Sequence, residues 1–399
     1  MTTSELSPGS SHSLPSRLRE LAALFFKLGT ISFGGPAAHI ALIETEVVRK
    51  REWVTRQQFL DMLGAANLIP GPTSTEVAIN LGFVRAGWAG LCVAGASFIV
   101  PAAIITGAFA WAYVRFGSLP QSGAVLAGIK PAVIAVITIA IFRLGKSAVK
   151  DAGLALLSVV ALAAFFLGLN PIALLFGGGF VGMLARRASS LRAAGMLQFP
   201  NLSKPVSLIW LSSAVVIGSA PVVVKPSITR IALFFLKIGA VLYGSGYVLL
   251  AFLDQGLVRQ QAWLTHQQLL DAVAIGQFTP GPVLSTATFI GYLLGGVPGA
   301  AVATVAIFLP SFFYVALLAP VLFRLRKSAW MAAFLDSVNV CAVALMAGVT
   351  FRLGADALRG WLSWVIAVAA LAVLLKWKMN PAWVVLGGGL AGLLVTVLR

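Results

Sequence analysis

The strongest constraint on this sequence is that its two halves repeat each other. Residues 25–72 align without a gap on residues 235–282, at an offset of 210, with 16 identities over 48 positions. Apolar composition alone would not align residue types as distinctive as these. The matched residues include Lys27/Lys237, Gly29/Gly239, Gly34/Gly244, Arg49/Arg259, Trp53/Trp263, Asp61/Asp271, Pro70-Gly71-Pro72/Pro280-Gly281-Pro282, Phe142-Arg143-Leu144-Gly145/Phe351-Arg352-Leu353-Gly354 and Asn170-Pro171/Asn380-Pro381. The chain therefore contains two copies of one structural unit.

Composition indicates what kind of unit is repeated. Of the 399 residues, 59% are hydrophobic and 10% are charged, whereas soluble domains contain roughly 45–50% and 25%. With a mean hydropathy of +0.95, the chain has too little polar surface to cover a water-soluble globule. The sequence therefore predicts an all-α polytopic membrane protein, in contact with a lipid bilayer.

The excess of positive charge, +17, is interpreted as the charge bias of membrane loops. Most of the Lys and Arg residues fall in short breaks between apolar runs, as the positive-inside rule requires, and no nucleic-acid-binding motif is visible. Cys92 and Cys341 lie in separate apolar runs without Cys or His neighbours, and the chain has three histidines. We therefore expect no metal site, no cofactor and no nucleic-acid partner.

Four segments are predicted along the chain: a disordered tail (1–20), a first repeat (21–186), a linker (187–228) and a second repeat (229–399). Each repeat is expected to hold about five spanning helices and one re-entrant helical hairpin. The first helix of each repeat (21–43; 229–252) is interrupted by small residues, and a polar elbow follows (44–57; 254–267). Pro-Gly-Pro divides the next stretch of each repeat (58–84; 268–296) into two short segments. In the first repeat these are 58–69 and 73–84, each too short to cross singly, since a span needs about 20 residues. They therefore predict the re-entrant hairpin.

Loop charge favours inverted rather than parallel repeats. Five crossings in each repeat would invert the second one, and this arrangement places more Lys and Arg on one side than a parallel arrangement does. The alternative depends on residues 206–224, which are apolar enough to cross but rich in Ser, Gly and Pro. Inverted repeats with broken helices are typical of secondary transporters, which bind their substrate at the repeat interface near the middle of the membrane.

The helix breaks and the Pro-Gly-Pro tips are the predicted substrate site. Gly and Pro free backbone groups that a continuous helix would use, and a helix that begins after Pro72 would direct N–H groups toward an anion. Alternatively, Pro-Gly-Pro only turns the hairpin. The predicted binding residues are Gly34, Gly35, Pro36, Pro70, Gly71, Pro72, Thr73, Ser74, Thr75, Gly244, Ser245, Gly246, Pro280, Gly281, Pro282, Ser285 and Thr286.

Three lysines are candidates for the positive charge of an anion site. Lys27 and Lys237 occupy equivalent positions before the two breaks, and Lys130 lies within an apolar run. A lysine at the bilayer centre costs about 3 kcal/mol, which favours a functional role. Snorkelling toward the membrane surface is the structural alternative.

Four residues are candidates for proton coupling: His39, Glu44, Glu76 and Asp254. Glu76 has no acidic counterpart and would repel an anion unless it were protonated or paired. Glu44 and Asp254 are equivalent elbow residues that can have structural roles, and His39 is opposite Leu249. Asp61 and Asp271 are interpreted as structural acids.

The motif Phe-Gly-Gly-Pro-x-x-His (33–39), the stretch from Glu44 to Trp53, Pro-Gly-Pro-Thr (70–73) and the duplicated Pro-Gly-Pro resemble the chromate ion transporter family. The resemblance covers about residues 21–398. It implies a multi-pass protein of the bacterial inner membrane that exports chromate and confers chromate resistance, without being an enzyme. The second repeat departs from the motif at Ser245, Gly246 and Leu249, so the resemblance at this motif is carried by the first repeat.

The resulting hypothesis is a secondary transporter that exports chromate, driven by the membrane potential, by proton antiport or by both. Sulfate, an oxyanion of the same shape, is expected to compete, and a homodimer is a candidate assembly. The alternatives are a carrier for sulfate or another oxyanion, and a passive anion channel.

Overall fold

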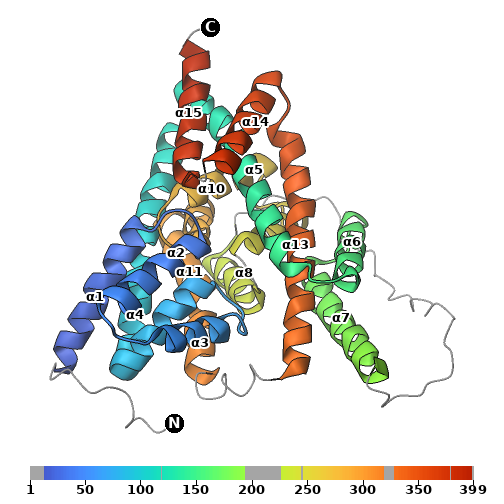
Figure 1. Cartoon of the computed structure of the whole chain (residues 1–399). Helices are drawn as coiled ribbons and strands as arrows, with labels where there is room; N and C mark the ends of the chain where they lie inside the picture. Colours follow the sequence, from blue (N-terminus) through green and yellow to red (C-terminus); the bar gives the residue numbers. More distant parts are fainter. Residues whose placement is uncertain are drawn as a thin grey trace.

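A computed structural model of the chain describes residues 13–117, 119–193, 226–243, 246–318, 328–377 and 379–397. These residues form helices and connecting turns, with no strand among them. Within the described ranges, four helices are long and apolar enough to cross a membrane, two in each repeat. The all-α class is thus confirmed (Figure 1).

The first helix of the first repeat is broken in the middle and folds back on itself. Helix α1 (Leu14–Ile31) ends before the break, α2 (Pro36–Glu44) follows it, and a π-helical turn (Thr45–Lys50) continues α2. Gly34 and Gly35, with φ of 106° and 80°, adopt the left-handed conformation that reverses the chain there. Arg85 binds Glu20 of α1 at 2.6 Å and lies 4.3 Å from the Trp53 ring. Through these two contacts, Arg85 holds the first turns of α1 next to the end of the elbow.

A second hairpin follows the elbow and carries the Pro-Gly-Pro tip. Helix α3 (Arg56–Ala66) begins with a capping box between Thr55 and Gln58, and α4 (Thr73–Phe116) begins directly after Pro72. Within α4, Ala86 and Gly87 leave the helical conformation. The chain reverses there so tightly that a Cβ on Gly82 would lie 2.2 Å from the carbonyl oxygen of Gly90. The segment 58–84 is therefore a re-entrant hairpin, as predicted.

Three more helices complete the first repeat. Helix α5 (Pro120–Ala148) is of spanning length, and the shorter α6 (Ala152–Phe166) and α7 (Pro171–Ala193) form a hairpin around Asn170-Pro171. The second repeat has the same plan, including a reversal at Gly295 and Gly296. Its elements are α8 (Ile228–Val241), α9 (Leu249–Leu253), a π-helical turn (Asp254–Gln260), α10 (His266–Phe278), α11 (Thr286–Leu318), α13 (Ala329–Ala357), α14 (Trp361–Lys376) and α15 (Pro381–Val397).

The two repeats run in opposite directions. Equivalent helices α5 and α13 pack antiparallel: Lys150, just beyond the end of α5, binds Asp336 near the start of α13 at 2.7 Å. At the other end, Gly354 of α13 lies next to Ile134 of α5. Accordingly, α6 and α7 extend from one end of α5, whereas α14 and α15 lie toward the other (Figure 1). The predicted inversion is therefore present in the fold.

Two details differ from the sequence prediction. Residues 14–20, predicted to be disordered, form the first turns of α1, because Pro15 starts the helix and Glu20 is held by Arg85. About five spanning helices were expected in each repeat, whereas within the described residues two helices of each repeat are long and apolar enough to span, and the others are shorter. The segment 206–224 lies outside the described residues, as do residues 1–12.

Candidate functional site

The Pro-Gly-Pro tips bind the helix breaks of the opposite repeat. Gly71 donates its N–H to the carbonyl of Leu242, at the break after α8, over 2.7 Å. Gly281 donates in the same way to Ser32, at the break after α1, over 2.8 Å. The structure therefore brings the predicted motifs together across the repeat interface, where inverted-repeat transporters bind their substrates.

Both glycines are required by their surroundings. Gly71 and Gly281 have φ of 143° and 85°, in the region that favours glycine. A Cβ on Gly71 would lie 2.2 Å from Glu76 Oε1 and 2.5 Å from Ser311 Oγ. A Cβ on Gly281 would lie 2.7 Å from Ala102 Cβ and 2.9 Å from the carbonyl oxygen of Gly29. The Pro-Gly-Pro sequence thus allows close packing as well as turning the chain.

A cavity of about 510 Å³ opens beside the first break. One wall comes from the break, α2, α3 and the start of α4, and includes Gly34, Pro36 and Thr73. The other wall comes from α5 and α13, and Pro381, at the tip of the α14–α15 hairpin, also lines the cavity. Lys150, whose side chain is 56% exposed, marks the outer rim. The cavity is therefore open at the end of α5 and the start of α13.

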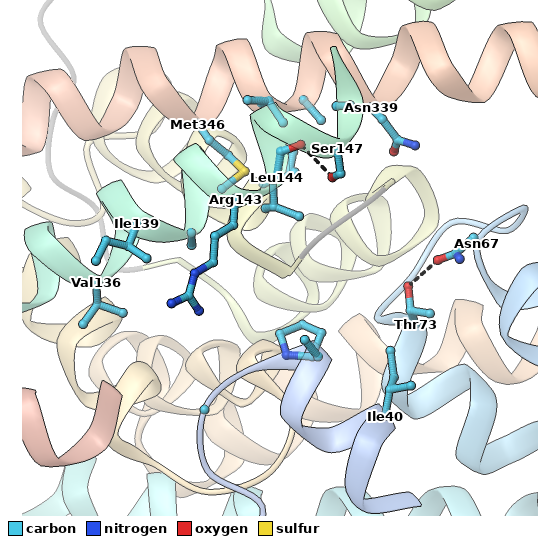
Figure 2. Close-up of a pocket in the computed structure, with 18 of the residues that line it drawn as sticks. Ile40, Asn67, Thr73, Val136, Ile139, Arg143, Leu144, Ser147, Asn339 and Met346 are labelled. Carbon is cyan, nitrogen blue, oxygen red and sulfur yellow. Dashed lines mark hydrogen bonds between the residues drawn. The ribbon is translucent and has the colours of Figure 1, made fainter. Parts of the chain in front are cut away.

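Two cations, Arg143 and Lys150, line this cavity, and Lys150 is paired with Asp336. Figure 2 shows the side chain of Arg143 extending from α5 into the space between α5 and α2. Within the described part of the chain, no carboxylate pairs with its guanidinium. Asn67, Thr73, Ser147 and Asn339 add polar groups to the same lining. A guanidinium with amides and hydroxyls around it is suited to bind an oxyanion.

The equivalent arginine in the second repeat, Arg352, is partly covered by Phe165. The guanidinium carbon of Arg352 lies 4.2 Å from the centre of the Phe165 ring, and Arg352 donates to the Phe165 carbonyl over 3.4 Å. The place equivalent to the cavity is occupied by α10, which packs against α5, α13 and α15. By contrast, α3, the counterpart of α10, packs chiefly against α4. The two halves thus share one sequence pattern, but the arginine of the first half faces an open cavity and that of the second half does not.

A buried ion pair lies on this closed side. Lys130 Nζ is 2.9 Å from Asp271 Oδ1, with both side chains less than 10% exposed, and Tyr113 donates to Asp271 Oδ2 over 2.8 Å. The residue equivalent to Lys130 is Asn339, which lines the open cavity. Lys130 is therefore neutralised by Asp271 and does not face the cavity with a free charge.

Lys27 and Lys237 also lie away from the cavity. Lys27 is 53% exposed and lies 3.4 Å from Glu46 at the elbow. Lys237 is exposed and lines a second cavity of about 510 Å³, together with Arg230, Asn170 and Gln260. The expectation that both lysines supply charge beside the breaks does not match their positions. Their ammonium groups extend toward the elbows, so snorkelling describes them better.

Three of the four proton-coupling candidates have polar partners. Glu44 lies 3.8 Å from Arg56, and Asp254 lies 2.9 Å from Arg259 and 3.2 Å from His266. His39 is buried, with Nε2 3.1 Å from the Ser32 carbonyl and Nδ1 3.4 Å from Ser74 Oγ. These contacts stabilise the break and the elbows.

Glu76 is different. It is 0% exposed, and neither carboxyl oxygen has a hydrogen-bond partner among the described residues. The carboxyl lies against Gly71, beside Ser311 Oγ of α11, which also has no partner in that part of the chain. Glu76 is therefore unusual, because buried polar groups in proteins are nearly always hydrogen-bonded and this buried acid, at the contact between the repeats, is not within the described residues.

The other predicted residues lie around the two tips. Ser285 Oγ accepts from Thr106 over 3.1 Å, and Thr286 donates to the Val283 carbonyl over 2.8 Å. Thr75 is buried, and its hydroxyl has no partner among the described residues. Gly246 packs near Val283 and Leu284, whereas Gly244 and Ser245 lie outside the described residues. The second tip thus lies in closed packing, in contrast to the open first break.

Arg143 and Asn339 were missed as site residues. A signal for Arg143 was present, because Phe142-Arg143-Leu144-Gly145 recurs as Phe351-Arg352-Leu353-Gly354. In the sequence, however, Arg143 stands beside Lys146 and Lys150, so the positive charge of a loop explains it without a binding role. No comparable signal marked Asn339, since its counterpart is a lysine.

Comparison with known proteins agrees with this architecture. The sequence profile of a family described as chromate transporter matches residues 19–183 and again 229–393. A chromate transport protein of Cupriavidus metallidurans is 34% identical over 96% of this chain and 95% of its own length. A probable chromate transport protein of Synechococcus elongatus is 32% identical over 91% of each chain. A chromate transport protein of Pseudomonas aeruginosa is 31% identical over 96% of this chain and 93% of its own length.

No solved structure matches the chain. The matched family is one of transporters, which confirms the prediction that the chain is not an enzyme.

Proposed function

Because the chain belongs to the chromate transporter family, we propose that it is a secondary transporter that exports chromate from the bacterial cytoplasm. It would act in the inner membrane and confer chromate resistance. The observation that carries the proposal is the cavity at the repeat interface. It contains the guanidinium of Arg143, which has no carboxylate partner among the described residues, the broken backbone at Gly34 and the hydroxyl of Thr73.

Chromate has the chemistry that this cavity is suited to bind. It is a tetrahedral oxyanion that is mostly a dianion at neutral pH, and its oxygens accept hydrogen bonds. Arg143 can donate to two of them at once, as guanidinium groups do with oxyanions. The amides of Asn67 and Asn339 can supply further donors from opposite walls. Sulfate has the same charge and shape, so we expect it to compete.

The difference between the halves supports alternating access. The cavity is open at the end of α5, where Arg143, Lys146 and Lys150 are clustered, and the positive-inside rule assigns such an end to the cytoplasm. On the other side, α10 packs on α5 around the Lys130–Asp271 pair. Exchanging the arrangements of the two repeats would close the first cavity and open an equivalent one around Arg352 on the opposite side.

Electrical energy favours export. A potential of about 100 mV, negative inside, is worth roughly 2.3 kcal/mol per charge, so a dianion that leaves gains roughly 4.6 kcal/mol. At about 1.4 kcal/mol per tenfold ratio, this sustains an outward gradient of roughly three decades. The membrane potential is therefore sufficient as a driving force, and proton antiport is an additional candidate.

The test is uptake of radiolabelled chromate into everted membrane vesicles, with and without an imposed potential and excess sulfate. We expect saturable uptake that an inside-positive potential drives and sulfate reduces. Accumulation of labelled sulfate without chromate would instead identify a sulfate carrier. Uptake that neither saturates nor shows counterflow would identify a passive anion channel.

A further inference from the structure

We infer that Glu76 is a proton-binding site that is occupied while the anion is bound, so that proton and oxyanion bind cooperatively. The inference rests on the proposed function for the identity of the anion. Its physical basis is the position of the carboxyl group, which is buried where the two repeats meet and lacks both a counter-ion and a hydrogen-bond donor within the described residues.

Among the described residues, no cation pairs with the carboxyl. Ser311 of α11 and the Cα of Gly71 lie against it. Nearby, Tyr243 donates its hydroxyl to the Leu68 carbonyl over 3.2 Å, and Tyr314 donates to the Ala240 carbonyl over 3.0 Å. An ionised carboxylate here would be an uncompensated charge in a low-dielectric interior, which is strongly unfavourable.

Within the described residues, the acids, the lysine and the histidines on the helices that pack around α4 have other partners. On α1, Glu20 contacts Arg85 and Lys27 contacts Glu46; on α2, His39 contacts Ser32 and Glu44 contacts Arg56 of α3. Asp61 of α3 accepts from Gln57, and on α10 His266 contacts Asp254 and Asp271 contacts Lys130. Arg17 of α1 is also bonded, and Arg19 is exposed. A proton on Glu76 is therefore the simplest way to remove its charge.

The proton site and the anion cavity share one structural element. Thr73, in the cavity lining, and Glu76 lie in the first turn of α4, and the same Pro-Gly-Pro tip leads into that turn. A dianion beside this turn would repel an ionised Glu76 and favour the protonated form. By linkage, protonation of Glu76 must then strengthen anion binding by the same factor.

The test compares wild type with Glu76→Gln, which imitates the protonated side chain. Chromate binding to purified protein is measured from neutral to alkaline pH, where chromate stays a dianion. We expect wild-type affinity to fall by up to about tenfold per pH unit once Glu76 ionises. Glu76→Gln should keep the high affinity at every pH. The same pH dependence in both proteins would overturn the inference.

Two further measurements keep the inference separate from the proposed function. Infrared spectra should show the carbonyl stretch of a protonated acid in wild type and in the control Asp356→Asn, whose carboxyl is on the surface, but not in Glu76→Gln. An unchanged band in Glu76→Gln would overturn the inference even if the protein bound no chromate. At alkaline pH, chromate addition should cause proton uptake by wild type and by Asp356→Asn, and none by Glu76→Gln.

Discussion

Arg143 and Arg352 are the same residue in the two repeats, yet their surroundings differ. Arg143 extends into an open cavity, whereas Arg352 stacks on Phe165 and binds its carbonyl. The difference does not come from the local motif, which is Phe-Arg-Leu-Gly in both repeats. It comes from the neighbouring helices, which leave one guanidinium accessible and partly cover the other.

Replacing Arg143 by Gln should weaken chromate transport by roughly 10- to 100-fold, because a hydrogen bond to a charged group is worth about 1.5–3 kcal/mol. Arg143→Lys should retain part of the activity, since it keeps the charge but loses the planar fork. The measurement is the concentration dependence of uptake into everted vesicles. Arg115→Gln, an exposed arginine near the end of α4, is the matched control and should behave as wild type. Normal uptake by Arg143→Gln would remove this residue from the site.

Glu46 at the elbow should make stability depend on pH. Burial alone would raise the pKa of its carboxyl, but contacts with Arg51, Lys50 and Lys27 outweigh burial and lower the pKa from 4.5 to about 2. Because the folded value is the lower one, the stabilisation is fully present above pH 4.5 and is lost as pH falls toward 2.

The corresponding variant is Glu46→Gln. It should lose on the order of 2 kcal/mol of stability at neutral pH, and the difference from wild type should shrink below pH 4.5. Thermal unfolding of purified protein in detergent, followed across this pH range, measures both effects. Glu52→Gln, in the same elbow, is the control. A difference that stays constant down to low pH would show that the ion pairs do not cause it.

At the scale of elements, the decisive contacts are those of the two Pro-Gly-Pro tips with the opposite repeat. Gly281→Ala should destabilise the protein by roughly 2 kcal/mol or more, because it combines a φ of 85° with a Cβ 2.7 Å from Ala102. The measurement is the melting temperature of purified protein in detergent. Gly177→Ala, in α7 with open space around its Cβ, should be neutral or slightly stabilising. Equal melting temperatures for both variants would contradict this account.

The sequence predicted the helices and their breaks better than the contacts that these elements make with each other. Pro-Gly-Pro, the helix breaks and the Asn-Pro tips were found as motifs, because backbone freedom is encoded locally by Gly and Pro. That Gly71 binds Leu242, or that Lys130 is neutralised by Asp271, depends on packing between segments far apart in the chain. For the same reason, the lysines near the breaks were expected in the site and Arg143 was not.

At the scale of the whole molecule, the Lys130–Asp271 pair should hold the closed side shut. Asp271→Asn leaves a buried ammonium without its partner and should cost about 3–5 kcal/mol of stability. The double variant Lys130→Met/Asp271→Leu should recover much of that stability, since apolar replacement of a buried pair is often neutral. Its transport rate should nevertheless differ from that of wild type, because the contact between α5 and α10, which must break when this side opens, is then apolar instead of ionic.

Thermal unfolding and vesicle uptake of both variants measure these effects. Asp61→Asn, at the equivalent position on α3, is the matched control and should be destabilised much less. If the double variant recovered both stability and the wild-type transport rate, the pair would have no role in closing that side.

The exchanged hydrogen bonds of the two tips have a consequence for how such a protein is made. Each repeat supplies the backbone donor that completes the other repeat's broken helix, through Gly71 to Leu242 and Gly281 to Ser32. Neither half can therefore finish its own site, although each carries a helix break and a Pro-Gly-Pro tip. Two separately synthesised halves should assemble into a working transporter when they are produced together, and a half produced by itself should need a second copy to complete its site.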